Sequence, residues 1–237
     1  MSHSIITMTT DFGTADAYVA VVKGVILDTN PDATIVDVSH DVPPHDINHA
    51  AYVLASAHGY FPNKTVHICV VDPGVGTERY GLAFFTPSGV FVGPDNGVFT
   101  YVVLANLERH VAAENFGRQT GKFMEPVQVD LPAGCYAYAL SDQQYWRKRV
   151  SPTFHGRDVF APVAAHLSLS IRPSELGSPV KKLICLNVHP PLVRRNSVKG
   201  RAIFVDHFGT LITNIQQSHL RGDVVRVDVG DATISGR

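Results

Sequence analysis

Three aspartates stand in glycine-rich turns, and each turn follows a stretch of residues that favours a β-strand. Asp11 belongs to the run TDFG, Asp72 to VDPGVG and Asp95 to GPDNG. Because glycine has no side chain, such turns let the backbone approach a ligand closely. An aspartate in a turn also accepts hydrogen bonds from its own backbone. Taken singly, Asp11 and Asp95 fit this turn-forming role better than a role in binding, whereas Asp72 favours a site.

A cation and a histidine could act together with the Asp72 carboxylate. Arg79 is the first arginine of the chain and could pair with that carboxylate. His155 stands in the run FHGRD, just before a predicted helix. An imidazole titrates near neutral pH and can act on a substrate, although a single histidine is more often solvated or a helix cap. Three other histidines cluster near the second predicted helix: His40, His45 and His49. Plain surface histidines are favoured there over a metal site.

The composition is that of a globular protein without a strong charge. The chain has 237 residues, of which 45% are hydrophobic and 17% charged, and its net charge is −1. This balance supports a sizeable core and gives no reason to expect a nucleic acid or an anionic membrane as partner. The three cysteines are far apart and predict neither a disulfide framework nor a CxxC pair. We see no signal-peptide pattern and no apolar run long enough to span a bilayer, so we expect a cytoplasmic protein.

The candidate turns need a parallel α/β sheet to bring them together. Strand and helix patterns alternate in the first half of the chain: strand 5–9, helix 18–26, strand 33–38, helix 47–55 and strand 65–71. The last of these strands is almost continuously apolar, as central parallel strands are. A hairpin is predicted at 82–92, and a helix at 158–169 with Pro162 in its first turn. The aromatic-rich segment 136–145 reads as a loop.

The sequence changes character after about residue 172. Four prolines interrupt the chain between 173 and 191, and short β segments with glycine-containing turns follow them. We therefore predict an α/β catalytic domain at 1–172 with a mostly parallel sheet, a linker at 173–196, and a small all-β, barrel-like domain at 197–237. In such a sheet, ligands bind beyond the carboxyl ends of the strands. The turns that carry Asp11 and Asp72 fall at those ends.

These motifs, taken in order, resemble the S-adenosylmethionine hydroxide adenosyltransferases, a family related to enzymes that fluorinate or chlorinate the same substrate. The matching runs are TTDFG at 9–13, VDPGVGTER at 71–79, GPDNG at 93–97, TFHGRDVFAPVAAHL at 153–167 and FGTLITNI at 208–215. The resemblance implies an N-terminal α/β domain, a C-terminal β-barrel and homotrimers with sites between subunits. It implies hydrolysis of S-adenosyl-L-methionine to adenosine and L-methionine, without a metal or other cofactor.

The resemblance also implies roles for individual residues. Asp72, Arg79 and His155 match the family's water-activating triad. The implied substrate-binding residues are Asp11 for the ribose hydroxyls, Asp16 and Asp206 for the methionine end, and in addition Asn96 and Thr210. The family usually carries asparagine at the place of Thr210, so an adenine contact there is expected to be weaker.

Two further features bear on the expected reaction. The halogenating relatives lack a carboxylate at the position of Asp72, so the resemblance implies water as the nucleophile. The printed sequence stops at Arg237, whereas family members continue through a Ser-Gly turn and further strands that contact the substrate. We therefore expect an incomplete barrel and weaker substrate binding than in longer relatives.

The implied reaction suits these side chains. The carbon that water attacks is bonded to a positively charged sulfur, so a neutral thioether leaves and no general acid is needed. Water has a pKa of about 15.7 and needs a base or strong polarisation. A carboxylate paired with Arg79 is a weak base, because the cation lowers its pKa. Arg79 and His155 could instead hold water or hydroxide while Asp72 fixes their geometry. The sequence leaves open which residue receives the proton.

Two other functions fit parts of the sequence. A metal-dependent hydrolase could use Asp11, Asp72, Asp95 and a histidine, since hard cations take oxygen ligands. Loss of activity in EDTA with rescue by a divalent ion would favour it. A nucleoside-binding protein without turnover is the second alternative, and it predicts adenosine binding without product formation.

Overall fold

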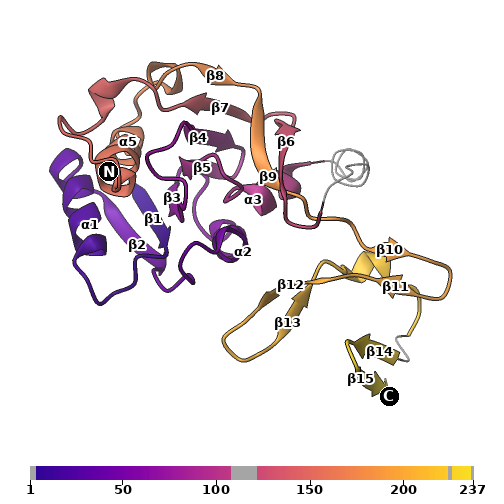
Figure 1. Cartoon of the computed structure of the whole chain (residues 1–237). Coiled ribbons are helices and arrows are strands. Elements are labelled where there is room, and N and C mark those ends of the chain that lie inside the picture. Colours follow the sequence, from indigo (N-terminus) through magenta and orange to yellow (C-terminus); the bar gives the residue numbers. More distant parts are fainter. Residues whose placement is uncertain (1–3, 108–121, 224–225, 236–237) are drawn as a thin grey trace. The chain divides into compact units, whose positions relative to one another are not determined.

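The computed structural model describes residues 4–107, 122–223 and 226–235. The chain divides into two compact units, Met1–Val188 and His189–Arg237, which are drawn in Figure 1. No helix among the described residues is long and apolar enough to cross a membrane.

The first unit is built on a seven-stranded sheet with the order β2-β1-β3-β5-β4-β7-β8. Its strands are β1 (Ile5–Thr10), β2 (Thr34–Ser39), β3 (Val66–Val70), β4 (Gly81–Thr86), β5 (Gly89–Pro94), β7 (Tyr136–Ala139) and β8 (Pro179–Val180). β2, β1, β3 and β5 run parallel, while the pairs β5–β4, β4–β7 and β7–β8 are antiparallel. The sheet is therefore mixed rather than mostly parallel, because the predicted hairpin and the strands after it extend one edge.

Helices cover both faces of this sheet (Figure 1). They are α1 (Tyr18–Thr29), α2 (Ile47–His58), α3 (Thr100–Asn106) and α5 (Ala161–Ser168). Successive strand residues point to opposite faces, so neighbouring residues enter different cores. Ile68 on β3 packs with α1 and α5, and Cys69 packs with α2 and α3. β3 is buried along its whole length, which confirms the prediction from its apolar run.

Two segments differ from their sequence predictions. Residues 136–139 form β7 rather than a loop, because they pair with β4 and the Tyr136 ring stacks on Phe85 at a centroid distance of 4.8 Å. Such cross-strand aromatic pairs stabilise sheets. The helix predicted from residue 158 begins as a π-helical turn at Gly156–Phe160, and α5 follows it with Pro162 in its first turn.

Residues that the prolines predicted as a linker belong in part to the first unit. β8 pairs with β7, and β9 (Lys182–Leu186) pairs in antiparallel fashion with β6 (Pro126–Asp130). Pro179 lies in β8 at the edge of the large sheet, where a missing backbone N–H is tolerated. The compact unit accordingly extends to Val188.

The second unit is all-β, in agreement with its predicted class. Its strands are β10 (Leu192–Val193), β11 (Val198–Lys199), β12 (Ala202–Val205), β13 (Leu211–Thr213), β14 (Arg226–Val229) and β15 (Ala232–Ser235). They form three separate antiparallel pairs, β10–β11, β12–β13 and β14–β15. The described strands form no closed barrel, since each pair is a ladder of two strands only.

Candidate functional site

The structure brings Asp72, Arg79 and His155 into direct contact. Arg79 Nε donates to Asp72 Oδ1 at 2.9 Å, and Arg79 Nη2 donates to Asp72 Oδ2. The same Nη2 lies 3.0 Å from His155 Nδ1. The Asp72 and Arg79 side chains are 5% and 13% exposed. Arg79 therefore bridges a carboxylate and an imidazole that are far apart in the sequence.

The loop that follows β3 holds Asp72 and Arg79 through tight backbone turns. Val75 N donates to Asp72 O at 3.1 Å, and the Thr77 hydroxyl donates to Gly74 O at 2.7 Å. Gly76 has φ +78°, and a Cβ there would lie 2.5 Å from the Pro152 carbonyl oxygen. This loop thus packs against the segment that leads to His155, and glycine is required at the contact.

His155 immediately precedes the π-helical turn that begins at Gly156. A Cβ on Gly156 would approach the Phe12 ring to 3.0 Å, so the start of this turn lies against the loop after β1. Single π-helical turns are rare and occur often at functional sites. The turn thus connects the histidine to the loop that carries Asp11.

The contact with Arg79 fixes the tautomer of a neutral His155. A guanidinium has only hydrogen-bond donors, so His155 Nδ1 must accept and the ring proton is assigned to Nε2. Burial and the Arg79 charge lower the pKa of His155 below its ordinary value, against weaker opposing effects of Asp72 and Asp158. The imidazole is therefore neutral at neutral pH and presents an N–H donor.

Aromatic side chains lie in the segments that carry the triad, and the sequence patterns did not single them out. Phe12, Tyr18 and Phe154 pack together with ring centroids 5.4–6.2 Å apart. The Arg79 guanidinium lies over the Phe160 ring at 5.4 Å. Phe12 and Phe154 stand beside Asp11 and His155 in the quoted runs, and this adjacency is the only sequence signal that could have found them.

Asp11 stands in a turn that several hydrogen bonds hold in place. Its carboxylate accepts from His45 N at 2.9 Å, and His45 has φ +68°. Phe12 N donates to the Thr10 hydroxyl at 3.3 Å. Asp16 is exposed in the bend before α1. The structure thus places the Asp11 carboxylate at the carboxyl end of β1, as the motif predicted.

Asn96 and Asp95 anchor the turn after β5. Asn96 Nδ2 donates to Val71 O at 2.9 Å, directly before Asp72. Asp95 Oδ1 accepts from Ile184 N at 2.7 Å. Burial raises the pKa of Asp95 to about 6, although the Ile184 N–H lowers it. These contacts give both side chains a structural role.

Asp206 and Thr210 face one another across a turn of the second unit. Thr210 N donates to Asp206 Oδ1 at 2.7 Å, and Phe208 N donates to the same oxygen at 2.9 Å. The Thr210 N–H is the main cause that lowers the pKa of Asp206 below its ordinary value. Asp206 thus holds its own turn, and the Thr210 side chain also hydrogen-bonds this carboxylate.

The family model for the SAM hydroxide adenosyltransferase N-terminal domain matches residues 6–177. The chain belongs to this family. The resemblance seen in its motifs is thereby confirmed. The matched range contains all three residues of the triad and ends in the segment before β8.

Named relatives match most of the length of this chain. An (R)-S-adenosyl-L-methionine hydrolase of Methanocaldococcus jannaschii is 38% identical over 91% of this chain and 68% of its own. The protein of the same name in Thermus thermophilus is 38% identical over 90% and 75%. A fluorinase of Actinoplanes is 26% identical over 92% and 74%. A crystal structure of an uncharacterized conserved protein from Thermotoga maritima has a TM-score of 0.77 at 36% identity, covering 97% of this chain and 80% of that one.

Other polar clusters of this family member lie outside the triad. The His40 ring contacts the Thr10 hydroxyl through Nδ1 at 2.8 Å and Asp37 Oδ1 through Nε2 at 3.0 Å. Across residues 4–107, 122–223 and 226–235, no three His, Cys, Asp or Glu side chains are grouped to share a metal ion. A hollow of about 550 Å³ between 141–144 and 174–178 is lined by none of the predicted site residues.

Proposed function

We propose that this chain hydrolyses S-adenosyl-L-methionine to adenosine and L-methionine at the triad of Asp72, Arg79 and His155. Its family membership and the names of its relatives support the reaction. The observation that carries the assignment to these side chains is the bridging position of Arg79, which hydrogen-bonds the carboxylate and the imidazole at once.

The reaction is a displacement at the ribose 5′ carbon. The oxygen of water or hydroxide forms a bond to this carbon while the bond between carbon and sulfur breaks. The bonding electron pair returns to the sulfonium sulfur, which leaves as the neutral thioether of methionine. One proton of the water is released. Because the leaving group is neutral, the step requires neither a general acid nor a cofactor.

The triad acts on the nucleophile chiefly by positioning and charge. His155 Nδ1 is occupied by Arg79, so the neutral ring offers its Nε2–H to the nucleophile oxygen. Both Asp72 oxygens accept from Arg79, so this carboxylate orients the guanidinium. We infer that the Arg79 charge and the His155 N–H stabilise a bound hydroxide, and that the proton which water loses on forming this hydroxide goes to solvent.

Protonation of His155 would abolish its contact with Arg79, because Nδ1 would then carry a proton and could not accept the hydrogen bond from Arg79 Nη2. The lowered pKa of His155 places this loss below the ordinary titration range of histidine. Turnover should therefore be constant above about pH 6.5 as far as this group is concerned, and fall as the pH drops through the pKa of the folded protein.

Substrate binding is assigned to three other carboxylates. We propose that Asp11 holds the ribose hydroxyls, while Asp16 and Asp206 bind the methionine end. Asn96 and Thr210 complete the proposed set, Asn96 by holding the end of β3 through Val71. The Phe12 and Phe154 rings pack with their centroids 5.7 Å apart, and we propose that they limit the access of bulk water.

The sulfonium sulfur is a stereocentre, and the relatives' names specify the (R) form. We propose the same preference here. Separate incubation with the (R) and (S) diastereomers tests it, because the account expects faster release of adenosine from the (R) form. Equal rates would remove stereospecificity from the proposal while leaving hydrolysis intact.

Isotope labelling tests the reaction itself. Incubation in oxygen-18 water, with and without EDTA, should give adenosine that carries the label at its 5′ oxygen, at the same rate in both samples. Chloride or fluoride should yield no 5′-halogenated adenosine, since Asp72 repels an anion at the nucleophile position. Unlabelled adenosine, or loss of turnover in EDTA with rescue by a divalent ion, would contradict the mechanism.

The homotrimer implied by the family resemblance stays a prediction, as does the cytoplasmic location. Sedimentation at micromolar concentration tests the assembly. A trimer agrees with sites shared between subunits, and a monomer contradicts them.

A further inference from the structure

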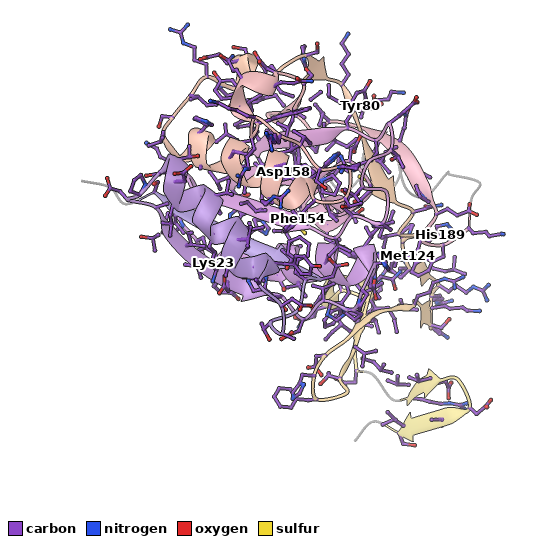
Figure 2. All side chains as sticks on the ribbon, turned by 60° about the vertical axis from the view of Figure 1, so that its left-hand side comes forward. Lys23, Tyr80, Met124, Phe154, Asp158 and His189 are labelled. Atoms are coloured by element: carbon purple, nitrogen blue, oxygen red, sulfur yellow. The ribbon has the colours of Figure 1, made fainter. Side chains whose placement is uncertain are left out.

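Asp158 is a completely buried carboxylate to which the proposed mechanism assigns no task. Its exposed fraction is 0%, and it lies in the π-helical turn that begins one residue after His155. Figure 2 labels Asp158 together with Phe154, another residue of the segment that leads into α5. Burial of a charge is costly unless partners compensate, so its contacts are the guide to its role.

Both oxygens of this carboxylate accept hydrogen bonds. Arg157 donates from Nε to Oδ1 and from Nη2 to Oδ2, each at 2.7 Å. Ser151 N donates to Oδ2 at 2.8 Å, and the Asp158 carbonyl accepts from Arg147 N at 2.9 Å. Burial alone would raise the pKa of Asp158, but Arg157 and the Ser151 N–H hold it below its ordinary value. The carboxylate is therefore ionised and fixed.

The segment held by Asp158 carries the histidine of the triad and contacts its arginine loop. Ser151 and His155 are the ends of a short loop. Buried Asp158 holds the first end of this loop through its hydrogen bond from Ser151 N. Its Pro152 carbonyl lies where a side chain on Gly76 would stand. The Arg157 guanidinium, fixed by Asp158, lies over the Phe154 ring at 4.9 Å. One buried carboxylate thus links both sides of the contact between Arg79 and His155.

We propose that Asp158 is a positioning residue, which fixes the loop 151–155 so that His155 Nδ1 meets Arg79. The role rests on the proposed function, because it matters for turnover only if His155 orients the nucleophile. Asp158 acts through His155 and does not itself touch the substrate. A misplacement of about 1 Å at a reacting group can cost about 100-fold in rate, so this anchor should have a measurable effect.

A double-mutant cycle separates positioning from general stabilisation. The variants are Asp158→Asn, His155→Gln and their combination, assayed for turnover at saturating S-adenosyl-L-methionine. Asp158→Asn should lower kcat at least about tenfold with little change in KM, but less than about twofold when His155 is already glutamine. A purely structural role would reduce the folded fraction equally in both backgrounds, and that result would overturn the inference.

A spectroscopic measurement decides the same question without turnover. Long-range proton–nitrogen spectra report which nitrogen of His155 carries the proton, and the His155→Gln variant identifies the signals. The wild type should show the Nε2–H tautomer, and Asp158→Asn a mixture of both. An unchanged tautomer in Asp158→Asn overturns the inference, whatever the kinetics. If the wild type makes no adenosine, the proposed function fails, and this spectrum still decides the role of Asp158.

Two further variants complete the design. Arg157→Lys keeps the positive charge but loses the paired hydrogen bonds to Asp158. It replaces Asp158→Asn in the test if that variant lacks the cooperative unfolding transition of a folded protein. The tautomer of His155 should then change in the same direction as expected for Asp158→Asn, but by less. Asp142→Asn is the matched control, because Asp142 accepts from Gln144 N in the turn after β7, outside the loop 151–155. Its His155 tautomer should be that of the wild type, and a change there as large as in Asp158→Asn would contradict a specific role.

Discussion

The two units of this chain differ most in what they bury. In the first unit, two hydrophobic cores lie on the two faces of one sheet, with α1 and α5 on one side and α2 and α3 on the other. In the second unit, none of the described residues is buried, and apolar side chains such as Phe208 and Ile234 are 89% and 61% exposed. The first unit is therefore stabilised by burial of its own apolar side chains, whereas the described part of the second unit has no such core.

This difference shows which side chains of the proposed site are held in place by the fold of a single unit. A two-stranded ladder is marginally stable in water by itself, so the second unit does not gain its order from a core of its own. The triad stands on loops anchored in the buried sheet of the first unit, and its geometry is fixed there. Asp206 and Thr210 are fixed only by their local turn, which makes their proposed roles dependent on the substrate or a neighbouring surface.

The largest expected contrast comes from removing one phenylalanine in each unit. Phe84 is fully buried, so Phe84→Ala should lower the free energy of unfolding by about 3–5 kcal/mol. Phe208→Ala should change it by less than about 0.5 kcal/mol, because the ring is exposed. Urea unfolding followed by circular dichroism measures both. A large loss for Phe208→Ala would show that this ring is covered in solution, and would remove the contrast.

A buried histidine gives the first unit a dependence on pH. The His67 ring stacks on Phe91, and its Nδ1 contacts the Thr7 hydroxyl at 2.8 Å. Burial lowers the pKa of His67 to about 4. The unfolded chain therefore binds a proton at this ring near pH 6.5, whereas the folded protein binds it only near pH 4. Titration of His67 thus lowers the free energy of unfolding by about 3 kcal/mol as the pH drops from about 6.5 to 4.

Substitution isolates this contribution. His67→Met should reduce the loss of stability between pH 7 and pH 5, whereas His207→Gln, at an exposed position of the second unit, should leave it unchanged. Unfolding in urea at both pH values provides the comparison. Equal pH dependence in the wild type and His67→Met would contradict a neutral buried ring.

Smaller effects are expected from the proposed binding carboxylates. A lost hydrogen bond to a charged group costs about 1.5–3 kcal/mol, so Asp11→Asn should raise KM about tenfold to a hundredfold and leave kcat less affected. Asp206→Asn should do the same if the second unit contributes to the site. A wild-type KM for Asp206→Asn would show that Asp206 of the second unit does not contribute to substrate binding. The contrast between the first unit and the second would then be sharper.

The sequence predicted the parts of the site that depend on chain-local patterns. Glycine-rich turns after apolar strands located Asp11 and Asp72, and the parallel register of β1 and β3 brings those strand ends side by side. The pairing of β7 with β4 was not predictable, because it joins strands across a long intervening segment and depends on aromatic packing. The His155 tautomer and the anchoring by Asp158 depend on side-chain geometry that spacing does not encode.

Turnover of Asp72→Asn tests the central claim most directly. The account predicts that kcat falls by about 10²–10³-fold, because Arg79 and His155 lose the anchor that orients them toward the nucleophile. KM should stay within about threefold of the wild type, since the lost interaction acts in the transition state. Adenosine release quantified by chromatography, with Asp142→Asn as control, provides both values. Wild-type turnover in Asp72→Asn would contradict the assignment of water activation to this triad.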